Sequence, residues 1–94
     1  MNIIDTIGIP AVLEQLAEES SELSKAALKV SRILRKENPT PITLDEALAD
    51  LEEEANDVRC VLLILSAKGY AEEAFTQIGE KITRWTTRLR EAGK

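Results

Sequence analysis

The sequence predicts an all-α protein, a compact bundle of three main helices, and three observations support this fold class. Apolar residues recur at three- and four-residue spacing in three long segments, which is the period of an amphipathic helix. No segment shows the sustained apolar–polar alternation of a strand, and the sequence contains neither an internal repeat nor a low-complexity tract. The heptads are not sustained enough for a long coiled coil. We therefore expect a single domain that spans residues 1–94.

The first predicted helix covers residues 10–36. Pro10 suits the opening turn, where the backbone N–H that proline lacks has no helical partner. The sequence Asn38-Pro39-Thr40-Pro41 then stops the helix. The residues expected to face the core are Leu13, Leu16, Ser20, Leu23, Ala27, Val30 and Leu34.

The second predicted helix covers residues 44–68. Thr43 and Glu46 have the spacing of a capping box at its start, and Gly69 is a suitable C-terminal cap. The expected core stripe is Leu44, Leu48, Leu51, Ala55, Val58, Leu62 and Leu65.

The third predicted helix covers residues 71–91, and Gly79 is its weak point. The last three residues should fray. The expected core stripe is Ala74, Phe75, Ile78, Ile82, Trp85 and Leu89.

Residues 60–65 form the longest uninterrupted apolar run, so the second helix is apolar nearly all round at this point. A chain of 94 residues is close to the lower size at which one core suffices, and three helices cover such a segment poorly. We expect homo-oligomerisation, as a homodimer or homotetramer, to complete the core. Within this run, Cys60 is predicted to be a buried small hydrophobe rather than a nucleophile.

Composition excludes several classes of function. The chain contains no histidine, which removes Ser-His and Cys-His catalysis and histidine-based zinc sites. A single cysteine excludes a disulfide framework, and a net charge of −5 argues against a general binder of nucleic acid or acidic membranes. The N-terminus has neither a basic segment nor a long apolar core, so we expect a cytoplasmic protein.

Two acidic clusters are the candidate functional residues. Each lies inside an apolar helical pattern and places carboxylates one helical turn apart, where like charges destabilise the helix by about 0.2 to 0.5 kcal/mol per pair. No Lys or Arg lies within either cluster, and grouped oxygen ligands are what Mg²⁺ or Mn²⁺ binds. The clusters are Glu18-Glu19-Ser20-Ser21-Glu22 and Glu53-Glu54-Ala55-Asn56-Asp57.

The alternative interpretation is that both clusters are solvated surface, since 31% of the chain is charged. The sequence seven residues downstream favours the functional interpretation, because seven residues return a helix to almost the same face. Glu54 is followed at this distance by Val61 and Asp57 by Ile64, so these carboxylates lie on sectors that become apolar. A carboxylate partly withdrawn from water needs a charged partner or a metal.

The order of these clusters on consecutive amphipathic helices resembles the signature of the MazG-like, all-α nucleotide pyrophosphohydrolases. The matching residues cover most of the chain, although the connection between the clusters is longer than in compact members. The flanking residues that strengthen the resemblance are Leu16-Ala17, Asn38-Pro39-Thr40-Pro41 and Lys81-x-x-Arg84-Trp85-x-x-Arg88-Leu89. The resemblance implies an α-helical homo-oligomer that uses Mg²⁺ to hydrolyse a nucleoside triphosphate to the monophosphate and pyrophosphate.

By this resemblance, carboxylates from both clusters hold Mg²⁺, with Mn²⁺ as a substitute, and another carboxylate orients the attacking water. The metal ligands are expected to be Glu19, Glu22, Glu54 and Asp57. The residue that orients the water is expected to be Glu18 or Glu53.

Substrate recognition would need cations and a flat apolar surface. Lys25 belongs to a basic edge that follows the first cluster, and Lys81 and Arg84 belong to another on the third helix. These three are the preferred phosphate-binding candidates, although solvated surface is the alternative for all of them. Trp85 could stack on a base, and its place in the apolar stripe equally suits a core or interface role.

Two alternative functions remain open. One is phosphoribosyl-ATP pyrophosphohydrolase of histidine biosynthesis, which the second cluster and the following Val61-Leu62-Leu63 also resemble. This chain begins almost directly at its first helix, without the longer N-terminal region expected there. The other is a non-catalytic helical interaction module with surface acidic groups. Metal binding discriminates the module from the hydrolase.

Overall fold

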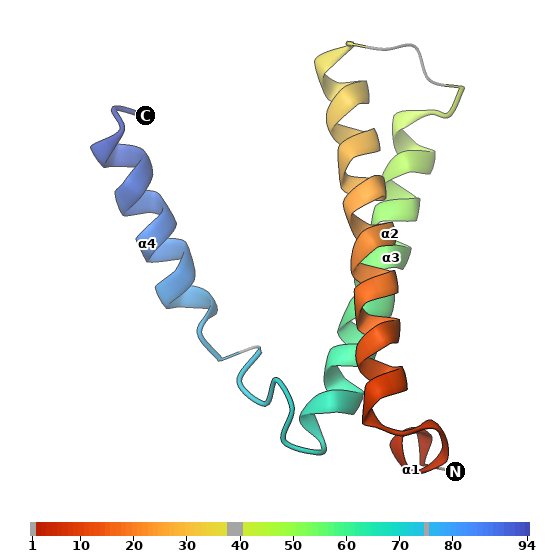
Figure 1. Ribbon diagram of the computed structural model, residues 1–94. Coiled ribbons are helices and arrows are strands. Elements are labelled where there is room, and N and C mark those ends of the chain that lie inside the picture. The colour runs from red at the N-terminus through yellow and green to blue at the C-terminus, as the bar shows by residue number, and fades with distance from the viewer. Residues whose placement is uncertain (1, 38–40, 75) are drawn as a thin grey trace.

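The structure is a computed structural model that describes residues 2–37, 41–74 and 76–94. Over these ranges the chain is helical and contains no strand, which confirms the all-α class and the three main helices (Figure 1). The sequence interpretation missed a short first helix. The elements are α1 (Ile3–Ile7), α2 (Ile9–Arg35), α3 (Leu44–Ser66) and α4 (Ile78–Glu91).

The ends of α2 follow from local chemistry. Gly8 separates α1 from α2 with a φ of 87°, a conformation that glycine adopts without a steric penalty, and Pro10 lies in the first turn as predicted. At the other end, Lys36 is left-handed, and its amide donates to the carbonyls of Arg32 and Ile33. The predicted stop at 38–41 falls largely on residues 38–40, which lie outside the described residues.

The predicted N-cap at the start of α3 is confirmed, and Glu46 contacts it through the Thr43 hydroxyl. The Glu46 amide donates to the Thr43 hydroxyl oxygen at 3.1 Å, and the Thr43 hydroxyl and the Glu46 carboxylate lie 3.2 Å apart. The helix ends at Ser66, two residues before the predicted end, and Gly69 follows with a φ of 83°.

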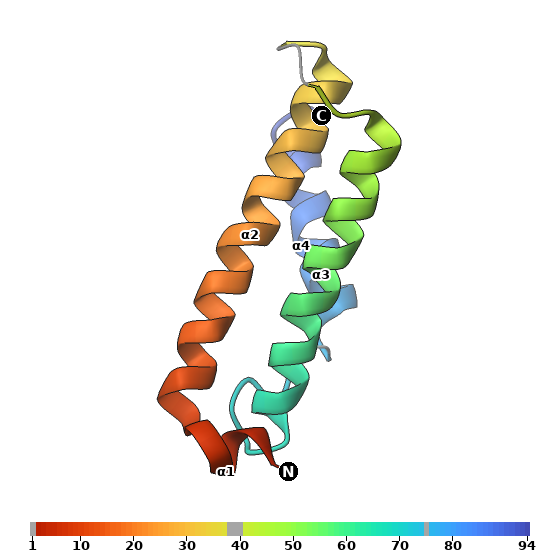
Figure 2. The same cartoon turned by 90° about the vertical axis from the view of Figure 1, so that its right-hand side faces the viewer.

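α2 and α3 form an antiparallel hairpin, with the two helices side by side (Figures 1 and 2). The residues buried or partly buried between them recur at alternating three- and four-residue spacing, and we call this contact the seam. On α2 the seam consists of Ile9, Val12, Leu16, Glu19, Leu23, Ala26, Val30 and Ile33. On α3 it consists of Leu44, Ala47, Leu51, Glu54, Val58, Val61 and Leu65.

The seam corrects the predicted core stripes. Every second residue of those stripes lies in the seam, but the others lie beside it, and Leu13, Leu34 and Leu48 are 43%, 62% and 44% exposed. The prediction chose the wrong flank because the period of one helix does not say from which side its partner approaches.

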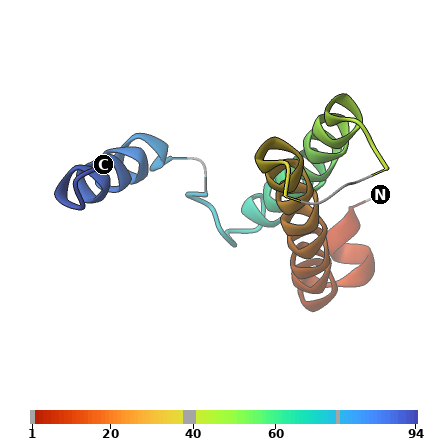
Figure 3. The same cartoon turned by 90° about the horizontal axis from the view of Figure 1, so that it is seen from above.

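α4 differs most from the sequence prediction. It begins at Ile78 rather than residue 71, after turns in which Ala71 has a φ of 54°. It stands apart from the hairpin (Figures 1 and 3). Its predicted core stripe is therefore exposed: Ile78 by 56%, Ile82 by 58%, Trp85 by 65% and Leu89 by 43%. Phe75, also assigned to that stripe, lies outside the described residues.

The apolar run at residues 60–65 is divided between two environments. Val61 and Leu65 are buried in a cluster with Ile4 of α1 and Val12 of α2. Leu63 is 66% exposed and Cys60 is also exposed, so the prediction of a buried Cys60 is wrong. In the part of the chain that the structure describes, no helix is sufficiently long and apolar to cross a membrane.

Candidate metal centre

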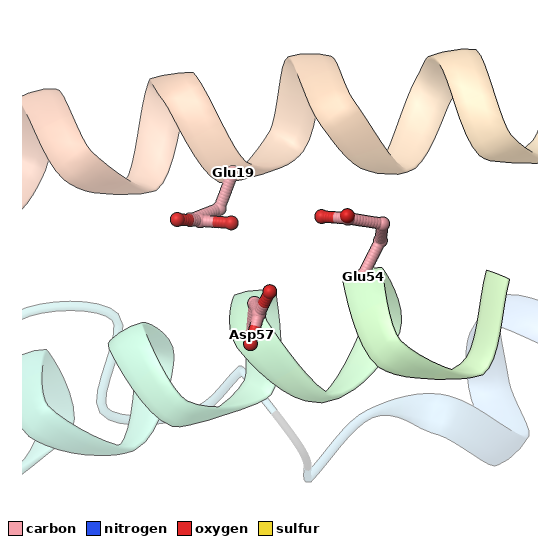
Figure 4. Close-up of side chains that lie close together, drawn as sticks. All are labelled: Glu19, Glu54 and Asp57. Atoms are coloured by element: carbon pink, nitrogen blue, oxygen red, sulfur yellow. The ribbon is translucent and has the colours of Figure 1, made fainter. Parts of the chain in front are cut away.

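The candidate metal centre lies in the middle of the seam, where both helices replace an apolar residue with glutamate. Glu19 extends from α2 and Glu54 from α3, so the two carboxylates meet between the helices (Figure 4). Asp57 follows Glu54 by one helical turn and joins them. One oxygen from each of the three carboxylates lies within 4.8 Å of the other two.

Burial and neighbouring charges both act on the Glu54 carboxyl. Glu19 and Glu54 are both partly buried. Burial raises the pKa of the Glu54 carboxyl, and so do the nearby carboxylates, of which Asp57 and then Glu19 act most strongly. Smaller contributions in the same direction come from Glu22 and Glu53.

The described residues supply little compensation for this charge. Gln15 donates its side-chain N–H to Glu19 at 2.7 Å. The ion pairs found among the described ranges are Lys25 with Glu22, Arg35 with Glu37, and Lys68 with Asp5, so none reaches the three clustered carboxylates. Like charges held together in a seam are a site where a cation would be stabilised.

The donor set fits a small hard cation. Ligand oxygens about 2.1 Å from Mg²⁺ in an octahedron are about 3.0 Å apart when adjacent and about 4.2 Å apart when opposite. The three oxygens lie no more than 4.8 Å from one another, so an opposite pair needs to approach by less than about 1 Å and an adjacent pair by less than about 2 Å, which side-chain rotation supplies. Three carboxylates leave positions for water or substrate oxygens, as Mg²⁺ sites that bind phosphates require.

The remaining predicted residues of the two clusters take different positions. Glu22 pairs with Lys25 at 3.5 Å and shares a hollow with Glu54, next to the three-carboxylate cluster. Glu18 and Glu53 are exposed. Glu53 is close enough to contribute to the raised pKa of Glu54.

A hollow of about 310 Å³ opens beside the carboxylates, between α2 and α3. It places two lysines on the α2 side, of which Lys25 was predicted as a phosphate ligand. Sequence reasoning missed Lys29 and Asp50 as members of this site. The signal was their spacing, since Lys29 follows Glu22 by seven residues and Asp50 precedes Asp57 by seven. The lining residues are Glu22, Lys25, Ala26, Lys29, Ala47, Asp50 and Glu54.

The predicted substrate residues of α4 lie elsewhere in this chain. Lys81 and Trp85 line a separate, mainly apolar hollow of about 400 Å³ along α4. Arg84 is on the same helix, and α4 stands apart from the hairpin that carries the acidic cluster (Figure 1). The structure thus brings together Lys25 and the carboxylates, but not the α4 residues.

Comparison with known proteins adds no further identification. No protein-family model, curated protein or solved structure matches this chain. The class that the fold and site define is an all-helical protein with a cluster of carboxylates between two antiparallel helices.

Proposed function

We propose that this protein is a Mg²⁺-dependent nucleoside triphosphate pyrophosphohydrolase that converts a (deoxy)nucleoside triphosphate to the monophosphate and pyrophosphate. The observation that carries the proposal is the cluster of Glu19, Glu54 and Asp57 at the seam. Two helices each give up an apolar contact there to place like charges together. The order and spacing of the clusters, which resemble those of MazG-like enzymes, supply the reaction type.

In this proposal the carboxylates and lysines have separate tasks. Glu19, Glu54 and Asp57 would hold the cation, with Glu22 as the fourth carboxylate at the edge of the hollow. When bound, Mg²⁺ neutralises triphosphate charge and lowers the pKa of coordinated water. Lys25 and Lys29 attract phosphate oxygens into the hollow.

Water activation falls to a carboxylate because the chain contains no histidine. Glu18 and Glu53 are the candidates that orient the attacking water, since each neighbours a metal-ligand candidate in sequence and is exposed to solvent. Attack at the α-phosphorus breaks the bond to the bridging oxygen and releases pyrophosphate.

The proposal also includes homo-oligomerisation and a cytoplasmic role. A dimer or tetramer would cover apolar side chains that one chain leaves in water, among them Leu63 and Trp85. Hydrolysis of cytoplasmic nucleoside triphosphates would remove aberrant nucleotides from the nucleotide pool.

Product analysis tests this function. Canonical and modified triphosphates are incubated with Mg²⁺ in ¹⁸O-labelled water, and we expect pyrophosphate together with label in the monophosphate. Glu19→Gln should abolish most turnover, whereas Glu14→Gln, on an exposed part of α2, should retain it. Orthophosphate as the sole initial product, or full activity in Glu19→Gln, would refute the proposal. Absence of any metal-dependent nucleotide binding would favour the interaction module.

A further inference from the structure

The two open faces of the hairpin differ in chemistry. Each helix of the hairpin has one flank on either side of the seam. In an antiparallel pair, a two-fold axis perpendicular to the plane of the two helices relates these flanks, so equivalent flanks of α2 and α3 lie on the same face. The polar flanks Glu22, Lys29 and Asp50 do meet, at the hollow beside the carboxylates. The apolar flanks must then meet on the opposite face.

We call this opposite surface the leucine face. Its three largest exposed side chains are Leu13 and Leu34 of α2 and Leu48 of α3. Smaller or partly buried apolar residues lie between them. The leucine face consists of Leu13, Ala27, Leu34, Leu48, Ala55 and Leu62.

α4 offers a matching apolar surface that no other element covers among the described residues. Its stripe of Ile78, Ile82, Trp85 and Leu89 is exposed throughout. An isolated helix of 14 residues is only marginally stable in water, so a stable α4 requires that this stripe packs against another surface. The length also fits, since α4 extends about 21 Å, the same as the distance from Leu48 to Leu62 along α3 at 1.5 Å per residue.

Charge complementarity favours the leucine face as the surface that α4 contacts. α4 contains four basic and two acidic residues, a net charge of +2, whereas α3 contains one basic and seven acidic residues, a net charge of −6. Lys81 and Arg88 border the α4 stripe, and Asp45 and Glu52 border the leucine face on α3. The two apolar surfaces are therefore edged by opposite charges.

The exposed area agrees with an obligate dimer. The chain exposes 7324 Å², whereas a folded monomer of 10.4 kDa exposes about 5,400 Å². Burial of the excess of about 1,900 Å² by each of two copies gives about 3,800 Å² in total, which lies within the range of roughly 2,000 to 5,000 Å² for obligate homodimers.

We infer that the protein forms a two-fold symmetric dimer in which α4 of each copy lies along the leucine face of the other. This inference rests on the homo-oligomer proposed above and specifies its surface. It leaves the hollow open to solvent, because the hollow lies on the other face of the hairpin. Lys81 and Arg88 approach Asp45 and Glu52 of the second copy.

Sedimentation equilibrium at micromolar concentration tests the surface. Trp85→Glu on α4 and Leu48→Glu on the leucine face should each raise the dimer dissociation constant by about 100-fold or more, because a charge without a partner enters a dry contact. The controls Thr87→Glu and Cys60→Glu place the same charge at exposed positions on the sides of α4 and α3 that face away from the proposed contact, and should leave the dimer intact. Circular dichroism checks that the hairpin of each variant remains helical.

Charge reversal tests the pairing. Lys81→Glu with Arg88→Glu should weaken the dimer, and Asp45→Lys with Glu52→Lys in the same chain should restore it. A second measurement needs no variant: amide exchange of α4 should be slow in the wild type and should accelerate on dilution. A wild type that sediments as a monomer would overturn the oligomer and the surface together. A dimer that survives both Trp85→Glu and Leu48→Glu, or α4 protection that is independent of concentration, would overturn the surface alone. These measurements do not use nucleotide turnover, so their outcome is separate from that of the hydrolase.

Discussion

At the scale of single residues, Glu19 and Glu54 are the charged residues of the seam. Both occupy positions of the seam that are otherwise apolar, and the charges repel across a partly buried contact. Such positions favour function over stability, since an apolar side chain would pack better there. This conflict is the reason to regard the cluster as a site.

Glu19→Leu should stabilise the metal-free protein and abolish the proposed hydrolytic activity. Leucine extends the apolar seam and removes a charge from the cluster, so we expect the free energy of unfolding to rise by about 1 kcal/mol. Urea denaturation of the wild type and the variant measures the difference. Glu14→Leu, at an exposed position of the same helix, should change the stability by less than about 0.5 kcal/mol. A destabilised Glu19→Leu variant would contradict the seam position.

The stability of the metal-free protein should depend on pH through Glu54. The folded-state pKa of Glu54 is raised above its unfolded value, so the folded state binds this proton more tightly. The resulting stabilisation is complete below the unfolded pKa and is lost as the pH rises through the raised folded pKa. Urea denaturation from mildly acidic to neutral pH should show this loss, and Glu54→Gln should reduce it.

Added Mg²⁺ serves as the control for this pH dependence. Binding requires ionised carboxylates, so the cation should stabilise the wild type at neutral pH and have little effect below the pKa of Glu54. A wild type and a Glu54→Gln variant with the same pH dependence would show that Glu54 does not titrate as described.

At the scale of the helices, periodicity and end signals predicted α2 and α3 to within about two residues. The N-cap and Pro10 are local chemistry, which a sequence displays directly. The start of α4 was missed because the turn before it uses a positive φ at Ala71, which an alanine does not signal. The residues of the seam were predicted only in part, because they depend on the side from which the partner helix approaches.

The start of α3 should depend on its cap. Thr43→Ala removes the side-chain acceptor for the Glu46 amide and should lower the free energy of unfolding by about 1 kcal/mol. Thr43→Ser keeps the hydroxyl and should restore most of the loss. Thermal unfolding of the three proteins measures both effects. Equal stability of Thr43→Ala and the wild type would show that the Thr43 hydroxyl does not stabilise α3.

At the scale of the whole molecule, the two faces of the hairpin differ in chemistry. One face carries the hollow with its lysines and acidic residues, and the other carries the exposed leucines. Helical spacing grouped the carboxylates within each acidic cluster, and the resemblance to MazG-like enzymes assigned Glu19, Glu54 and Asp57 to one site. Lys25 was predicted from the basic edge that follows the first cluster. Whether Lys81, Arg84 and Trp85 reach any acidic cluster depends on α4, which stands apart in this chain, and helical spacing cannot determine that.

The proposed function requires carboxylates from α2 and α3 to hold a divalent cation together on a nucleotide. The most direct measurement is Mn²⁺ binding by electron paramagnetic resonance, with Mn²⁺ in place of Mg²⁺ and with a non-hydrolysable α,β-imido triphosphate. We expect the wild type and Glu14→Gln to bind Mn²⁺ more tightly when the nucleotide is present. Glu19→Gln on one helix and Asp57→Asn on the other should each weaken this binding about tenfold or more while the fold is retained. Mn²⁺ binding that is absent in the wild type, or equally tight in Glu19→Gln and Asp57→Asn, would contradict the proposal.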